Sequence, residues 1–219
     1  MELDVMEALR YLGAGDRPPE TLRKSVEEMA QMLTATLQPR FVYRVFSLNR
    51  EEEGARLREA ELLLPGHTAG RMLETCDQAV LLACTLGAEF DALLRREQVR
   101  DMARAAILNA CGSAWVEAGC EAAEREIAER FPERFLTDRF SPGYGDLPLS
   151  LQPDVCAALD ARRRLGIYVS NSNLMTPVKS VTAIIGLSDG PQMARIRGCG
   201  FCSMRETCQL RKGGKTCGN

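Results

Sequence analysis

Apolar side chains recur at helical spacing over several parts of the chain. Residues 3–12 carry them on one side and are followed by glycines, so this segment predicts a short helix. Residues 25–37 carry a longer stripe, and Ser25 with Glu28 three residues later predicts a capping box at its start. Helix-forming and small residues dominate residues 89–130, which predicts one tightly packed central helix or a helix pair.

Short apolar runs between these helices predict strands. Residues 41–48 alternate large apolar with smaller or polar side chains, and residues 79–86 form a continuous run typical of a buried strand. Residues 57–64 fit either a strand or a helix. Further strands are expected at 135–140, 165–170 and 179–187, and short helices at 70–76 and 155–164. Because no regular βαβ alternation is present, we expect an α+β fold with a twisted, mainly antiparallel sheet flanked by helices.

Length and charge narrow the class of protein. A chain of 219 residues suits one domain with a small appendage, and a formal net charge of −2 gives no support to a nucleic-acid binder. Glu2 and Asp4 stand where a secretory signal has basic residues. The longest apolar run is far shorter than the roughly 18 residues of a membrane span. We therefore expect a cytoplasmic protein without a membrane partner.

The nine cysteines fall into two groups. Five are scattered singly among apolar residues and are expected to pack in the core. The other four form the pattern Cys199-x2-Cys202-x5-Cys208-x8-Cys217, with many basic residues around them. Four thiolates this close suit zinc or a 4Fe–4S cluster, although free thiols or a disulfide-forming tail remain alternatives. We expect residues 1–190 to form the domain and residues 191–219 a cysteine-rich metal or iron–sulfur tail.

The loop Arg139-Phe-Ser-Pro-Gly-Tyr-Gly-Asp-Leu-Pro148 combines groups that suit a ligand site. Its glycines let a backbone approach a ligand closely, and its prolines fix the surrounding turns. Arg139 offers a planar fork for a carboxylate, and Tyr144 a ring that can stack or donate a hydrogen bond. A surface turn with a chance arginine and tyrosine is the alternative on spacing alone.

This loop, RFSPGYGDLP, resembles the arginine-x-x-proline-glycine-tyrosine loop of the activation domain of cobalamin-dependent methionine synthase. SNSNLMTPVKSVTAIIG, residues 170–186, resembles the serine-rich, proline-containing segment of that family, and EAGCEAAERE from Glu117 resembles its glutamate-bearing helix. The resemblance runs from about residue 79 to residue 186. It is greatest to the short, stand-alone versions of the domain.

The resemblance implies a domain that binds S-adenosylmethionine and serves the reactivation of cob(II)alamin. One electron and a methyl group from S-adenosylmethionine restore methylcobalamin in that family. The cobalamin would be bound by a partner, either a methionine synthase subunit or another corrinoid protein. The electron would come from a donor such as flavodoxin or ferredoxin. Methyl transfer from a sulfonium needs no proton relay, so no catalytic side chain is expected on this chain.

The resemblance also assigns the ligand-binding residues. Arg139 would hold the methionine carboxylate, Tyr144 would lie over the ligand, and the Ser141 backbone would contact the adenine beside Gly143. Glu117 and Glu133 would face the positive end of the ligand, since one arginine and two acids complement its charges. The alternative for these two acids is the solvated face of a helix, because they lie in a charge-rich run.

A different class of function is also compatible with the sequence. An iron–sulfur or zinc protein that keeps the fold without the ligand could act in interaction or electron transfer for another corrinoid methyltransferase. It would show metal but no affinity for S-adenosylmethionine. A reductase-like partner of such a methyltransferase is a third hypothesis, and exchange of the corrinoid protein in a reactivation assay would distinguish it.

Overall fold

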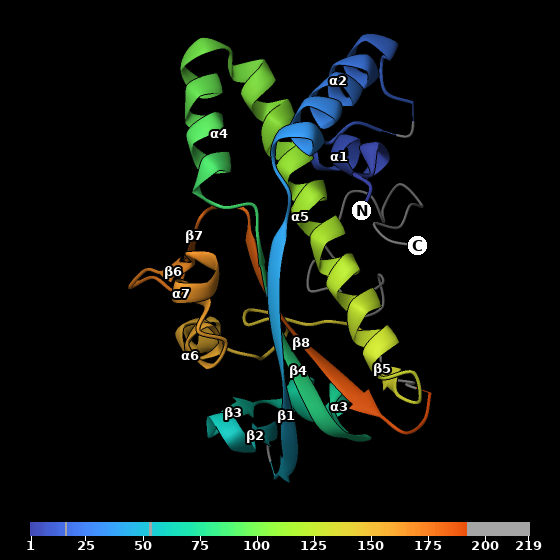
Figure 1. The fold of residues 1–219 in the computed structure, drawn as a ribbon, viewed down its shortest axis with the longest axis vertical. Helices are drawn as coiled ribbons and strands as arrows, with labels where there is room; N and C mark the ends of the chain where they lie inside the picture. Colours follow the sequence, from blue (N-terminus) through green and yellow to red (C-terminus); the bar gives the residue numbers. More distant parts are fainter. Residues whose placement is uncertain (16, 53, 192–219) are drawn as a thin grey trace. The chain divides into compact units, whose positions relative to one another are not determined.

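The structure is a computed structural model that describes residues 1–15, 17–52 and 54–191 (Figure 1). Its helices are α1 (Val5–Tyr11), α2 (Glu20–Thr36), α3 (His67–Met72), α4 (Ala88–Arg100), α5 (Met102–Arg130), α6 (Gln152–Ala158) and α7 (Ala161–Leu165), with 3₁₀ turns η1 (Arg58–Ala60) and η2 (Leu149–Leu151). Its strands are β1 (Arg40–Glu51), β2 (Gly54–Leu57), β3 (Leu62–Pro65), β4 (Cys76–Thr85), β5 (Phe135–Leu136), β6 (Tyr168–Val169), β7 (Met175–Thr176) and β8 (Ser180–Ser188).

Six of these strands form one sheet in the order β3-β2-β1-β4-β8-β5, and β6 pairs with β7 (Figure 1). The edges of the large sheet are antiparallel: Leu48 of β1 lies opposite Leu57 of β2, and Phe135 of β5 opposite Ser188 of β8. The continuous apolar run in β4 is fully buried from Ala79 to Thr85, as expected for a central strand. The predicted α+β class with a mainly antiparallel sheet is confirmed.

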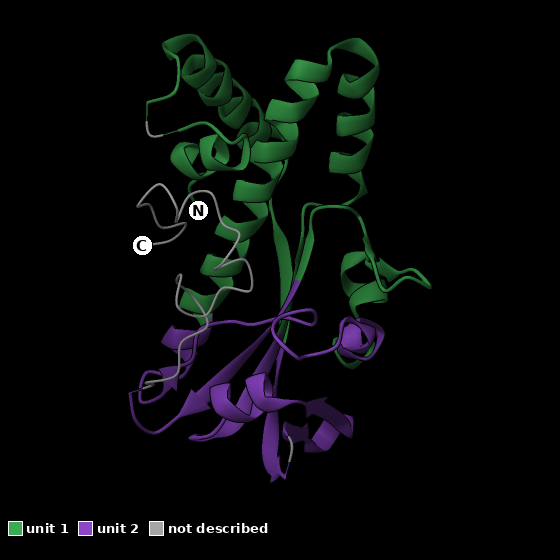
Figure 2. Cartoon of the chain, turned by 180° about the vertical axis from the view of Figure 1, so that it is seen from behind, with its two compact units in different colours: residues 1–43, 82–126, 156–181 green, residues 44–81, 127–155, 182–219 purple. Residues whose placement is uncertain are grey.

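The chain divides into two compact units (Figure 2). Unit 1 comprises residues 1–43, 82–126 and 156–181, and unit 2 comprises residues 44–81, 127–155 and, among the described residues, 182–191. The strands β1, β4 and β8 each supply residues to both units.

Unit 1 is built on close approaches of α5 to its neighbours. Trp115 is 2% exposed and donates its indole N–H to the Leu37 carbonyl at 2.8 Å. A methyl group at Gly112 would lie 2.3 Å from the Phe90 ring, so only glycine allows this contact with α4. Of the two predicted alternatives for residues 89–130, the helix pair is the one observed. Asp101 divides the helices, because its extended backbone ends α4 and its side chain caps α5.

The start of α2 differs from the prediction. The helix begins at Glu20 and not at Ser25. Pro19 is its N-cap residue and has a non-helical backbone conformation. Ser25 lies inside the helix, where its hydroxyl donates to the Thr21 carbonyl at 3.0 Å. The predicted capping box is therefore wrong: in the middle of a helix, serine can bond to the preceding turn instead of capping a terminus.

Three further segments are more broken than predicted. The ambiguous residues 57–64 form the end of β2, the turn η1 and the start of β3. The predicted strand 135–140 is regular only at 135–136, and Phe140 then rejoins β8 through a single bridge to Ile184. The predicted helix 155–164 is divided into α6 and α7 at Asp160, which adopts a left-handed backbone with φ 52°.

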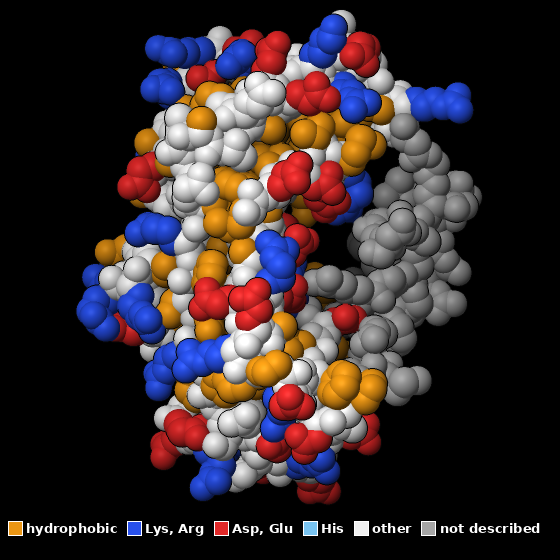
Figure 3. Space-filling view, turned by 45° about the vertical axis from the view of Figure 1, so that its right-hand side comes forward, with side chains coloured by type: hydrophobic (Ala, Val, Ile, Leu, Met, Phe, Trp, Pro, Cys, Tyr) orange, Lys and Arg blue, Asp and Glu red, His pale blue; other side chains and the backbone are white. Residues whose placement is uncertain are grey.

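The described residues carry acidic and basic side chains on their surface, in agreement with the small net charge of the sequence. Acidic and basic side chains are interspersed over the face seen in Figure 3. Within the described part of the chain, no helix is both long enough and apolar enough to cross a membrane. Even the 29-residue helix α5 is interrupted by charged side chains.

Candidate functional site

The loop of residues 139–148 lies in unit 2 and is tied to β8 where it begins. Phe140, which is fully buried, exchanges backbone hydrogen bonds with Ile184 at 3.1 and 2.7 Å. The Ser141 hydroxyl donates to the Thr182 carbonyl at 2.6 Å. Gln152 then donates its side-chain amide to the Thr182 hydroxyl at 2.7 Å, and both of these side chains are buried. The start of the loop is thus fixed against a core strand.

The middle of the loop is a compact turn that leaves an aromatic ring in solvent. The Tyr144 N–H donates to the Ser141 carbonyl at 3.0 Å, and the Leu147 N–H donates to the Tyr144 carbonyl at 2.9 Å. Gly143 has a φ of 95°, a conformation that favours glycine, and donates its N–H to the Leu147 carbonyl at 2.8 Å. Leu147 is buried, whereas the Tyr144 side chain is 52% exposed. The turn therefore presents its ring outward on a fixed backbone.

The end of the loop is held by the carboxylate of Asp146. This group accepts the backbone N–H of His67 at 2.6 Å and that of Thr68 at 2.9 Å. Both donors belong to the first turn of α3, whose N–H groups have no partner within the helix. Hydrogen bonding to the Thr68 side chain, then to the Thr68 and His67 backbones, lowers the pKa of Asp146 to about 2. Asp146 is therefore ionised at neutral pH.

Four of the six predicted ligand-binding residues share this loop: Arg139, Ser141, Gly143 and Tyr144. Arg139 is half-buried and has an interaction partner. Glu133 is exposed and lies in the connection from α5 to β5 in the same unit. The structure therefore brings the residues of the predicted loop into one continuous, ordered turn, with Glu133 a few residues before it.

Glu117 lies in the other unit, on α5. It is half-buried and close to Tyr11 of α1. Burial, followed by the negative charges of Glu117 and Glu7, raises the pKa of the Tyr11 hydroxyl to about 12. A role of Glu117 beside the loop stays a prediction.

The predicted metal ligands Cys199, Cys202, Cys208 and Cys217 lie outside the described residues. Within the described ranges, no three His, Cys, Asp or Glu side chains gather in a way that could hold a metal ion. The remaining five cysteines are all buried, as predicted for core residues. Burial raises the pKa of Cys76 to about 11 and that of Cys111 to about 12, so these thiols stay protonated.

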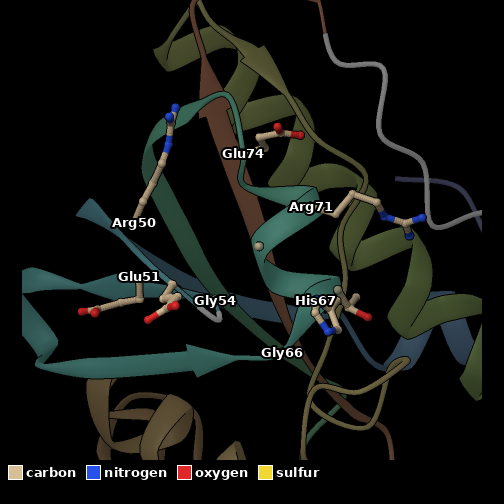
Figure 4. Close-up of a pocket in the computed structure, with 10 residues that line it drawn as sticks. Arg50, Glu51, Gly54, Gly66, His67, Arg71 and Glu74 are labelled. Carbon is tan, nitrogen blue, oxygen red and sulfur yellow. The ribbon is translucent and has the colours of Figure 1, made fainter.

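A cavity of about 600 Å³ lies in unit 2 beside α3 (Figure 4). Its lining mixes charges of both signs, and the charged members are exposed: Arg50, Glu51, Glu52, Arg71 and Glu74, with His67 at the α3 end. It contains none of the predicted ligand-binding residues. Gly66, His67 and Thr68 line it, and these residues also surround Asp146, so the cavity borders the anchor of the loop.

Sequence reasoning missed the residues that hold the loop. Asp146 stands inside the loop that was singled out, but its partners at positions 67 and 68 are almost 80 residues away. Thr182 and Gln152 each look like an ordinary polar residue in the sequence. The only local signal was the run Pro-Gly-His-Thr at 65–68, a turn leading into a helix, which leaves first-turn N–H groups in need of an acceptor.

Comparison with known proteins shows a likeness in fold. No protein-family model matches the sequence, and no curated protein matches it. The α+β architecture occurs in a solved structure described as the crystal structure of the MetH reactivation domain bound to AdoHcy. The TM-score is 0.63 with 17% sequence identity, over 94% of this chain and 76% of that chain. The chain therefore has the fold of a methionine synthase reactivation domain, and at this identity the likeness extends to the fold alone.

Proposed function

We propose that the chain binds S-adenosylmethionine through the loop of residues 139–144 and acts as a reactivation module for a corrinoid protein on a partner chain. The likeness in fold to a reactivation domain that carries AdoHcy is the observation that supports this most strongly. A second support comes from the chain itself: the loop that resembles the family's ligand loop is ordered, with an exposed ring at its turn.

The chemistry of the loop complements the ligand. S-adenosylmethionine presents a carboxylate, an ammonium and a sulfonium group. The Arg139 guanidinium suits the carboxylate, because its fork can donate two parallel hydrogen bonds. The exposed Tyr144 ring offers a face for the ligand, and the backbone at Ser141 and Gly143, where the side chain is small or absent, allows close approach of the adenine. In this proposal Glu133 faces the positive end of the ligand, and the predicted role of Glu117, which belongs to unit 1, stays a prediction.

The reaction that such a module would serve consumes one electron. Cob(II)alamin, one electron and S-adenosylmethionine give methylcobalamin and S-adenosylhomocysteine. The residues of this chain would bind the sulfonium compound, orient its methyl group and exclude water, because the sulfonium is already an activated donor. The cobalamin would be supplied by a methionine synthase subunit or another corrinoid protein, and the electron by a flavodoxin or a ferredoxin.

Calorimetric titration with S-adenosylmethionine tests the proposal. We expect measurable binding by the wild-type protein and an affinity at least tenfold lower for Arg139→Ala, since a charge-assisted bidentate contact is lost. Arg139→Lys keeps the charge without the fork and should fall between the two. Arg58→Ala removes an exposed arginine elsewhere in unit 2 and serves as the matched control. Equal affinities for wild type and Arg139→Ala contradict the proposal.

We further infer that the four clustered cysteines hold an iron–sulfur cluster or zinc, on the strength of their spacing alone. A 4Fe–4S cluster would fit a reaction that consumes an electron. Metal analysis and visible absorption of anaerobically purified protein distinguish the two. Metal together with no affinity for S-adenosylmethionine would favour the alternative, an interaction or electron-transfer protein for another corrinoid methyltransferase.

A further inference from the structure

The contact between Asp146 and α3 is unusually close on both sides. At Gly66, which has a φ of 97°, an added methyl group would lie 2.7 Å from the Asp146 carboxyl carbon. At Gly145, with a φ of 56°, it would lie 2.3 Å from the Thr68 hydroxyl. At both positions glycine is favoured by the positive φ and is also the only residue small enough for the contact. The loop and the first turn of α3 fit together at backbone distance.

The carboxylate acts as a cap for a helix to which it does not belong. Gly66, the N-cap residue of α3, has no side chain that could accept the first N–H groups of the helix. The two oxygens of Asp146 accept one each, from His67 and Thr68, and the Asp146 N–H in turn approaches the Thr68 hydroxyl at 3.5 Å. Because the bonds run in both directions, the loop cannot shift along the helix without breaking several of them.

The turn that carries the exposed ring lies between two anchors. Ser141 is bound to β8 at one end, and Asp146 is bound to α3 at the other. Only four residues separate the two anchors, and Tyr144 is in the middle of them. A short segment fixed at both ends has little conformational freedom left to lose when a ligand binds.

We propose that Asp146 is a positioning residue for the ligand loop: through its bonds to α3 it sets the backbone of residues 141–146, and hence the placement of Tyr144, for S-adenosylmethionine. This inference rests on the proposed function. Asp146 itself touches no ligand in this proposal, because its carboxylate is already occupied by the two N–H groups of α3.

Three variants test this role by titration with S-adenosylmethionine. Asp146→Ala removes both acceptors and should weaken binding about tenfold or more, whereas Asp146→Asn keeps one acceptor and should weaken it less. Asp154→Asn removes an exposed charge from α6 in the same unit and should bind like the wild type. The affinity falls because a loop that is no longer held by α3 must be ordered each time the ligand binds.

A double-mutant cycle separates positioning from a general loss of stability. If Asp146 acts by placing the Tyr144 ring, Asp146→Ala should cost much less affinity in a Tyr144→Ala background than in the wild type, because the ring that the anchor places is then already absent. Additive losses of affinity would overturn the inference, and so would equal affinities of wild type and Asp146→Ala.

The anchor can also be observed without any ligand. The chain contains one histidine, so an untagged protein labelled with ¹⁵N-histidine gives a single backbone amide signal. The His67 N–H donates to a carboxylate at 2.6 Å, so this signal should lie downfield and move upfield in Asp146→Asn but not in Asp154→Asn. An unmoved signal in Asp146→Asn overturns the anchor. A wild type with the anchor signal but no affinity for S-adenosylmethionine overturns the proposed function, and this inference with it.

Discussion

The loop 139–148 of unit 2 and the segment 170–180 of unit 1 both contain proline, and both are held by an aspartate that accepts backbone N–H groups. In the loop, the aspartate is Asp146, which belongs to the segment itself and is exposed. In segment 170–180, it is Asp91 of α4, which is 7% exposed and accepts the Val178 N–H at 3.1 and 3.2 Å.

The surroundings of the two anchors differ as much as their exposure. The two residues after Val178 in the sequence also make polar contacts. The Lys179 ammonium donates to the Ser113 hydroxyl at 2.8 Å, and the Ser180 hydroxyl lies 2.8 Å from that of Thr85. Burial lowers the pKa of Lys179, and the charge of Asp91 counteracts this shift. Asp91 is thus a buried acceptor that also acts electrostatically on Lys179, whereas water has access to Asp146.

A hydrogen bond from a backbone N–H to an aspartate can therefore serve two purposes. Where water is excluded, a lost acceptor leaves a donor without a partner, and the cost appears in the stability of the fold. Where water has access, it replaces the lost acceptor, and the cost appears in the placement of the loop. We therefore expect Asp91 to govern unfolding and Asp146 to govern binding.

The largest expected effect is the loss of stability in Asp91→Ala. Removing the carboxylate deprives the Val178 N–H of its acceptor and the Lys179 ammonium of a compensating charge, which should lower the free energy of unfolding by about 2–3 kcal/mol. Urea denaturation followed by circular dichroism measures this value. Gln98→Ala, at an exposed position of the same helix, is the control. If Asp146→Ala proved more destabilising than Asp91→Ala, the comparison would fail.

A smaller effect is expected for Gly145→Ala, which presses the loop against α3. The left-handed backbone opposes a side chain, and the methyl group would displace the Thr68 hydroxyl, so we expect a loss of about 1–2 kcal/mol in free energy of unfolding. Gly166→Ala is the matched control, because φ is 71° there and no atom lies within 4 Å of the added methyl group. Equal losses in the two variants would show that contact with Thr68 contributes nothing.

The sequence predicts regular elements better than the contacts that hold the site. The stripe in α2 and the apolar run of β4 follow from periodicity, which is a local property. The helix pair of residues 89–130 was one of two alternatives, and the break at Asp101 was not predicted. The break at Asp160 was missed, because a left-handed aspartate leaves no mark on the periodic pattern of residues 155–164. The start of α2 was missed because Ser25 and Glu28 have the spacing of a cap without being one.

The site shows the same limit. The loop of Arg139 and Tyr144 could be singled out from its residue types, whereas its two anchors could not. Asp146 bonds to α3 across almost 80 residues, and Ser141 bonds to β8 across 41. These pairs form only when distant segments are brought together, so no window of sequence contains both partners.

The smallest expected effect is the pH dependence of the Asp146 anchor. Its pKa of about 2 in the folded protein lies below the usual value of about 3.9, so the folded state binds this proton more weakly than the unfolded state. The stabilisation by Asp146 is therefore complete above about pH 4 and is lost as the pH falls towards about 2. Because the side chain is exposed, we expect it to amount to less than about 1 kcal/mol.

Urea denaturation of wild type and Asp146→Asn at several pH values between 7 and 3 measures this contribution. The difference in free energy of unfolding between the two proteins should be constant from pH 7 to about pH 5 and should shrink below about pH 4. A difference that grows on acidification has the wrong sign for a carboxylate held by N–H donors. It would mean that the pKa of Asp146 is raised in the folded protein, which contradicts the hydrogen bonds that its carboxylate accepts from His67 and Thr68.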